Sequence, residues 1–355
     1  MNRLFWYVAR SLIVWVSTVW AGLLCFDAVF AFLGEITDIG RGEYGLKQVF
    51  SYTALTLPRR AYALFPMACL IGTLLGLGNL AAKSELVAAR ASGVSIRRLI
   101  VWSCLAGIMM LLIALVVGEG LAPMTEAQAG YLRSQAIFNR VAVQDERGVW
   151  IRDRQRYVHI GSAIESTHLQ DVQVFEFDEN HRLLYASQVS DAYYNGENWT
   201  LHNVFQTQFN GDIISVAPIP EATWSLLIDP ELIDVLAQGP DNMTLPELSR
   251  YIAYLKASEI SSLRYRMHFW SRIIQPVTAI VMIVLGATFV LGRQQRSGIA
   301  WRLFIGILAG LGFKLLSEVV SQAGIVYGLP VVISVVGPIL LTVLMIIGLM
   351  KRLAM

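Results

Sequence analysis

Charged residues are scarce in this chain of 355 residues. Only 15% of them are Asp, Glu, Lys or Arg, whereas 55% are apolar and the mean hydropathy is +0.54. A soluble domain carries about a quarter charged residues, so much of the apolar surface must face a bilayer rather than water. The remaining charges are balanced, 28 basic against 26 acidic. This balance argues against nucleic-acid binding through bulk electrostatics.

Cysteine is also rare, and the motifs of common catalytic sites are missing. Three cysteines stand far apart inside apolar runs, so neither a disulfide framework nor a metal-ligand spacing is visible. The histidines of the polar middle region lack the number and spacing of zinc ligands. The sequence contains no phosphate-binding loop and no nucleophile elbow. We therefore predict no catalytic residue, no metal, no cofactor and no ATPase site within the chain.

Long apolar runs are what the sequence does contain. A helix needs about 20 apolar residues to cross a hydrocarbon core, and three runs of this kind precede a polar insert while three follow it. The first run is too long for a signal peptide and no small-residue cleavage site follows it, so we expect it to remain as a span. The six runs are Leu12–Leu33, Ala61–Leu80, Leu99–Leu121, Ile273–Leu291, Ile299–Leu316 and Leu329–Leu349.

Basic residues mark one side of this arrangement. They lie near both termini and in the connections after the second and fourth spans, where Arg293 and Arg296 are examples. The connections around Glu35–Lys47 and Glu318–Tyr327 are neutral or acidic. Short loops rich in Lys and Arg stay in the cytoplasm. We therefore expect both termini in the cytoplasm and the insert outside.

The insert, residues 135–238, has the pattern of an all-β domain. Apolar and polar residues alternate in Val172–Phe177 and Trp199–Val204, and turn signals follow at Asp178–Asn180 and Asn195–Gly196. Such strands are typical of a sandwich, a jelly roll or a small barrel.

We expect residues on one face of these strands, such as Val174 and Phe205, to line an apolar interior. After the insert, Thr244–Glu247 forms a capping box that opens a linker helix. The expected domains are the first three spans, the β domain and the linker helix with the last three spans, at residues 1–134, 135–240 and 241–355.

The connection between the second and third spans contains a short helix signal over residues 84–92. Ser84 can cap this helix, Glu85 lies in its first turn and Gly93 can end it. Its small apolar side chains suit a groove on another protein, although a solvated connector helix is an alternative. The candidate docking residues are Ser84, Glu85, Leu86, Val87, Ala91 and Gly93.

Several motifs along the whole chain resemble the YjgP/YjgQ permease family, the membrane subunits LptF and LptG of the lipopolysaccharide exporter. Four motifs are more similar to the LptG branch than to the LptF branch: Gly118–Glu119, Ala122–Pro123, Tyr254–Lys256 and Trp270–Pro276. The other matching motifs are Pro58–Arg60, Phe65–Ala68, Gly72–Gly78, Ser84–Leu86 and Ala91–Gly93.

The resemblance implies a permease subunit of an ABC transporter in the inner membrane of Gram-negative bacteria. Such a transporter extracts lipopolysaccharide from the outer leaflet and passes it to a periplasmic bridge. The implied partners are an LptF-like permease subunit, an LptB-like ATPase dimer, an LptC-like single-span protein and an LptA-like bridge. The insert would be a periplasmic jelly roll, and residues 84–92 would be the coupling helix in the ATPase groove. A polytopic membrane enzyme or a receptor for an envelope lipid is the alternative.

Basic residues near the outer boundary of the spans are candidates for contacts to lipid phosphates. Each charge-assisted contact is worth roughly 1.5–3 kcal/mol, and interfacial snorkelling is the alternative for each residue. Lys314 could instead pair with Glu318, one turn away. The candidates are Arg59, Arg60, Arg133, Arg272 and Lys314.

The outer end of the first span departs from the family pattern. Some relatives carry lysines there that meet substrate phosphates, whereas residues 31–38 contain none. Asp27 lies about 9 Å inside this end at 1.5 Å per residue. We expect it to be paired, protonated or facing the lateral gate, because an unpaired charge at that depth is costly.

Overall fold

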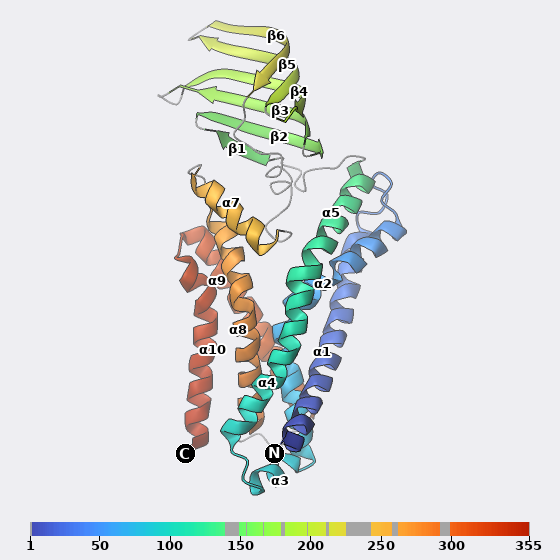
Figure 1. The fold of residues 1–355 in the computed structure, drawn as a ribbon, viewed down its shortest axis with the longest axis vertical. Helices are drawn as coiled ribbons and strands as arrows, with labels where there is room; N and C mark the ends of the chain where they lie inside the picture. The colour runs from blue at the N-terminus through green and yellow to red at the C-terminus, as the bar shows by residue number, and fades with distance from the viewer. Residues whose placement is uncertain are drawn as a thin grey trace. The chain divides into compact units, whose positions relative to one another are not determined.

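The computed structural model describes most of the chain as long helices and one sheet (Figure 1). The described residues are 2–138, 149–153, 155–165, 167–178, 182–196, 198–210, 213–224, 243–257, 262–291 and 299–354. Arg293, Arg296 and His181 lie outside them, as do two residues of the turn predicted at Asp178–Asn180.

Six helices within the described residues are long and apolar enough to cross a membrane. They contain five of the six predicted runs in full and the sixth from Val331 onward, so the six predicted spans are confirmed. The third span is composite, because α4 continues through a π-helix, η1, into α5. The helices are α1 (Asn2–Ile36), α2 (Leu46–Ala82), α3 (Glu85–Ala91), α4 (Ile96–Leu115), η1 (Val116–Leu121), α5 (Ala122–Phe138), α7 (Leu245–Ala257), α8 (Leu263–Leu291), α9 (Ile299–Tyr327) and α10 (Val331–Ala354).

The chain divides into two compact units. The first comprises residues 1–34, 56–124 and 263–355, and the second comprises residues 35–55 and 125–262. Glycine permits close helix packing in the first unit. A Cβ atom at Gly72 of α2 would lie 2.5 Å from the Cα atom of Val16 in α1. Helices α1 and α2 therefore approach each other closely at Gly72.

The second unit contains a six-stranded antiparallel sheet in the order β1-β2-β3-β4-β5-β6. The predicted fold class, six membrane helices with an all-β insert after the third, is confirmed. Short connections join each described strand to the next as a meander, whereas a jelly roll has Greek-key crossovers. The strands are β1 (Val149–Asp153), β2 (Arg156–Glu165), β3 (His168–Phe177), β4 (Leu183–Tyr194), β5 (Trp199–Asn210) and β6 (Ile213–Trp224).

A line of irregular positions crosses the middle of this sheet. Asp171 of β3 and Asn203 of β5 have positive φ values of 50° and 54°. In β5 the buried residues are Trp199, Leu201 and Val204, so one residue separates the first two, whereas two residues separate Leu201 from Val204. Alternation therefore shifts by one position, and the inward side chains on both sides of the shift join one apolar cluster.

This shift changes the assignment of two predicted interior residues. Val174 packs against the apolar cluster, as predicted. The prediction for Phe205 is wrong, since its side chain is 55% exposed whereas that of its neighbour Val204 is 4% exposed. The left-handed conformation of Asn203 is the cause, because unbroken alternation from Leu201 would have placed Phe205 inside.

Candidate functional site

Helix α3 is a short, well-anchored element at the end of the helical unit that also holds both termini (Figure 1). It ends as predicted, because Gly93 has a φ of 91° and the amides of Gly93 and Val94 donate to the carbonyls of Arg90 and Ala89. Its start differs from the prediction. Ser84 has a φ of 59° and its hydroxyl makes no capping hydrogen bond, so the helix begins without a side-chain cap.

One side of α3 packs into the chain and the other remains open. Leu86 is 2% exposed and belongs to the apolar core of the helical unit, so it anchors α3 and is not part of the accessible surface. Val87 is 55% exposed, and Ser84, Ala91 and Gly93 are exposed with it. Of the six predicted docking residues, Ser84, Val87, Ala91 and Gly93 are therefore exposed, Glu85 is half-buried and Leu86 is buried.

Glu85 has a partner inside the chain. The Tyr7 hydroxyl of α1 donates a hydrogen bond of 2.9 Å to Glu85 Oε2. This contact joins α3 to the first span across 78 positions of sequence. The carboxylate of Glu85, which was predicted as an acidic contact to another protein, therefore has a hydrogen-bond donor within the chain.

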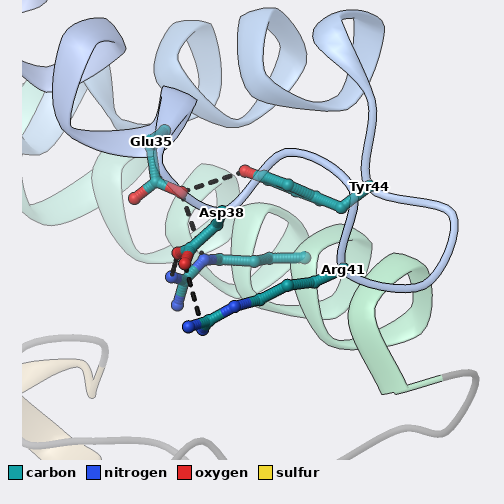
Figure 2. Close-up of polar contacts among 5 residues, drawn as sticks. Glu35, Asp38, Arg41 and Tyr44 are labelled. Atoms are coloured by element: carbon teal, nitrogen blue, oxygen red, sulfur yellow. Dashed lines mark hydrogen bonds and ion pairs between the residues drawn. The ribbon is translucent and has the colours of Figure 1, made fainter.

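Arg133 of α5 forms ion pairs with two carboxylates, one at the end of α1 and one in the loop that follows. Figure 2 shows this cluster with Glu35, Asp38, Arg41 and Tyr44 labelled. Arg133 Nε donates to Glu35 Oε2 at 3.2 Å, and its guanidinium also pairs with Asp38. Arg41 binds the same Asp38 carboxylate at 3.0 Å, and the Tyr44 hydroxyl donates to Glu35 at 3.0 Å. We call these five residues the Arg133 cluster.

The Arg133 cluster fixes the loop between α1 and α2 against the end of α5. Tyr44 is buried, and burial together with the Glu35 carboxylate raises its pKa well above the ordinary value, so its hydroxyl remains a donor. The Glu43 amide donates to the Ala136 carbonyl at 2.7 Å. Gly42, with a φ of 58°, lies so close that a Cβ atom would be 2.6 Å from the same carbonyl oxygen.

From the sequence we predict that Arg133 contacts a phosphate, and we note only that residues 31–38, which include Glu35 and Asp38, contain no lysine. In the structure these two carboxylates are the partners of Arg133. A phosphate that binds Arg133 must therefore compete with two carboxylates.

Asp27 and Arg60 form an ion pair between α1 and α2. Arg60 Nη1 lies 3.0 Å from Asp27 Oδ2, and each side chain is 33% exposed. Arg60 Nε also donates to the Thr56 hydroxyl at 3.3 Å. Of the three states expected for Asp27, the structure shows the paired one, and Arg60 has a carboxylate beside it already.

Arg272 is buried at a junction of α2, η1 and α8, where Gln275 Nε2 donates to the Tyr62 carbonyl at 2.7 Å. The charges of Glu119, Arg272 and Arg59 all act on the Tyr62 hydroxyl. Within the described residues, that hydroxyl and Glu119 Oε1 are buried without a hydrogen-bond partner. This junction was not predicted from the sequence, because no local sequence pattern indicates the π-helix that contains Glu119.

A cavity of about 260 Å³ lies between α2, α8 and α9 and contains Lys314. The α9 side of the cavity is polar, with Ser317, Glu318 and Ser321 beside Lys314, and Ser271 of α8 adds a further hydroxyl. Among the five predicted phosphate contacts, Lys314 is the one to which the described part of the chain offers no ion pair or hydrogen bond.

Helix α2 lines the other side of this cavity. Leu64, Pro66 and Met67 belong to that wall, and Met282 of α8 and Phe313 of α9 extend the apolar surface. The cavity thus combines an apolar wall with charged and hydroxyl groups. This composition is typical of sites for amphipathic molecules.

In the β domain, His168 of β3 pairs with Asp191 of β4, with 3.0 Å between Nε2 and Oδ1. The hydrogen bonds from His168 and Gln170 lower the pKa of Asp191 below its ordinary value. This polar contact links two neighbouring strands and is a structural feature of the sheet.

Within the described residues, six helices able to span a membrane and one large β insert define a multi-pass membrane protein with an extramembrane domain. The model of the family described as "Lipopolysaccharide export system permease LptF/LptG" matches residues 6–352, and the chain belongs to this family.

Two relatives carry the same name, "Lipopolysaccharide export system permease protein LptG". The chain is 28% identical over 355 residues to the protein of Haemophilus influenzae, which is 99% of each chain. It is 28% identical over 335 residues to the protein of Escherichia coli, which is 94% of this chain and 93% of the relative. The predicted family is confirmed, and with it a multi-pass permease of the inner membrane.

Proposed function

We propose that this chain is the transmembrane subunit of an ATP-driven exporter that extracts lipopolysaccharide from the outer leaflet of the inner membrane and passes it to a periplasmic bridge. The chain does not hydrolyse ATP itself. An LptB-like ATPase dimer supplies the energy. The other partners are an LptF-like permease subunit, an LptC-like single-span protein and an LptA-like bridge. Both termini lie in the cytoplasm and the β domain lies in the periplasm.

The observation that carries this proposal is the geometry of α3. Leu86 holds the helix in the core, Tyr7 holds Glu85, and Val87 and Ala91 remain exposed. A short helix with small apolar side chains on its open face fits a groove on another protein. The helix also lies at the end of the unit that holds both termini, and the distribution of basic residues supports a cytoplasmic location for that end.

The test replaces Val87 with glutamate. This change puts a charge into the docking surface and leaves the buried side of α3 untouched, so we expect the ATPase subunit to be lost on purification while the amount of chain in the membrane stays normal. Lys47→Glu is the matched control, because Lys47 is exposed and lies outside α3. Full retention of the ATPase by Val87→Glu would reject α3 as the coupling helix.

Among the candidate phosphate contacts, we propose that Lys314 meets the substrate first. Arg60 and Arg133 each face a carboxylate already, so a phosphate gains less from them than from Lys314. Arg59 and Arg272 would contribute at the junction around Tyr62. Lys314→Gln should therefore slow lipopolysaccharide release more than Arg60→Gln or Arg133→Gln does.

We further propose that acyl chains pass along the inner face of the β domain. A photo-crosslinking amino acid at Val204 should trap lipopolysaccharide in an ATP-dependent manner, whereas one at Phe205 should not, because the two side chains point to opposite faces. Equal trapping at the two positions would contradict a conduit.

A further inference from the structure

The cavity between α2, α8 and α9 holds two opposite charges that do not neutralise each other. Lys314 and Glu318 both line it, one helical turn apart on α9. Both side chains are exposed, and no ion pair between them occurs within the described residues. The order of the two residues disfavours such a pair, since Lys before Glu at this spacing is weaker than Glu before Lys.

Unpaired charges in a membrane-spanning helix are costly, so each of these two groups calls for a partner. An ammonium group suits a phosphate, and a carboxylate suits a primary ammonium. Three hydroxyls, those of Ser271, Ser317 and Ser321, line the same cavity and can bind the remaining phosphate oxygens.

The rest of the cavity suits the start of an acyl chain. Leu64, Met67 and Phe313 provide apolar surface opposite the charges. A volume of about 260 Å³ accommodates a headgroup with the beginning of its chains and excludes a whole lipopolysaccharide molecule.

We propose that this cavity is a binding site for a zwitterionic phosphoethanolamine group, with Lys314 on the phosphate and Glu318 on the primary amine. The proposal rests on the function proposed above for Lys314 and adds a role for Glu318. Two sources offer this chemistry: a phosphatidylethanolamine molecule of the bilayer, and a phosphoethanolamine substituent on the exported lipid.

The test measures lipid binding to the full chain, purified with the subunits that accompany it, by native mass spectrometry. Phosphatidylethanolamine is compared with phosphatidylethanol of the same acyl chains, which keeps the phosphate and lacks the amine. The wild type should bind phosphatidylethanolamine about ten-fold more tightly, as expected for one additional charge-assisted contact.

Variants separate the two charges. Glu318→Gln should abolish the ten-fold preference and retain phosphatidylethanol binding, which also shows that the variant is folded. Lys314→Gln should weaken both lipids. Glu43→Gln and Lys47→Gln, which change exposed charges outside the cavity, should alter neither affinity.

Equal affinities of the wild type for the two lipids, or a preference that survives in Glu318→Gln, would overturn the proposal. If Lys314→Gln then still weakens both lipids, the phosphate contact of the proposed function stands and only the zwitterionic site falls. If Lys314→Gln changes nothing, both fall.

A second arm distinguishes the sources. Release of lipopolysaccharide with and without phosphoethanolamine is measured from vesicles that lack phosphatidylethanolamine. If Glu318→Gln slows release only of the lipopolysaccharide that carries phosphoethanolamine, the site binds the exported lipid. If the wild type and Glu318→Gln release both forms of lipopolysaccharide at equal rates while the wild type keeps its ten-fold preference, the site binds the bilayer lipid.

Discussion

Replacing Gly72 with alanine should push α1 away from α2 and weaken the contact between the two helices. The added Cβ would lie 2.5 Å from the Cα atom and 2.9 Å from the amide nitrogen of Val16. Both are backbone atoms, which no rotamer change can move aside. Carbon atoms in favourable contact are about 3.5–4.0 Å apart, so the two helices must separate by about 1 Å.

The cost of this separation follows from the contacts along the same interface. Overpacking in a tight core costs about 1–3 kcal/mol. The hydrogen bond of 2.7 Å from Trp20 Nε1 to the Ala61 carbonyl bridges the same helices and would weaken, which adds about 1 kcal/mol. Only 11% of the residues in the most apolar stretch of α1 are buried within the chain, so few other contacts hold α1 in place.

Thiol labelling reports this opening directly. Cys69 is fully buried in α2, and with Cys25 and Cys104 replaced by alanine it becomes the single reactive thiol. We expect Gly72→Ala to lower the temperature at which a maleimide labels Cys69.

Gly22→Ala is the matched control, because a Cβ atom at Gly22 of α1 meets nothing within 4 Å. It should leave the labelling temperature unchanged or raise it slightly through helix propensity. A labelling temperature for Gly72→Ala equal to that of the wild type would refute the packing argument.

Two further predictions concern charged contacts of the second unit. Because the pKa of Asp191 is lowered in the folded chain, the stability it contributes is present above the ordinary value of about 3.8 and is lost as the pH falls through the lowered value. Asp191→Asn should therefore reduce the difference in urea stability between about pH 5 and about pH 3 by some tenths of a kcal/mol, up to about 1 kcal/mol. A difference equal to that of the wild type would contradict this. Arg133→Gln leaves Glu35 and Asp38 without their shared cation, so it should speed proteolysis of the loop after α1 several-fold. The control variant Lys47→Gln should not speed it. Equal cleavage rates for the two variants would show that the Arg133 cluster does not hold the loop.

The features that were predictable from the sequence are those set by neighbouring residues. The six spans follow from continuous apolar runs, and the end of α3 follows from one glycine, Gly93, that accepts a positive φ.

The features that were not predictable depend on residues far apart or on unusual backbone geometry. Arg133 finds its carboxylates 98 and 95 positions away, so no local pattern indicates the cluster. The orientation of Phe205 depends on the left-handed conformation of Asn203, which alternation does not reveal. Leu86 is an apolar residue in the predicted docking helix, yet tertiary packing buries its side chain.

ATP-dependent release of lipopolysaccharide from vesicles, measured for Glu85→Lys beside Tyr7→Phe, tests the central claim most directly. Tyr7→Phe removes the hydrogen bond to Glu85 without changing the charge, so it should retain release. Glu85→Lys should lose both release and the ATPase subunit, because reversing a charge in a desolvated interface costs roughly 2–5 kcal/mol or more. Release that continues at the wild-type rate in Glu85→Lys, or that proceeds without the ATPase, would contradict the account.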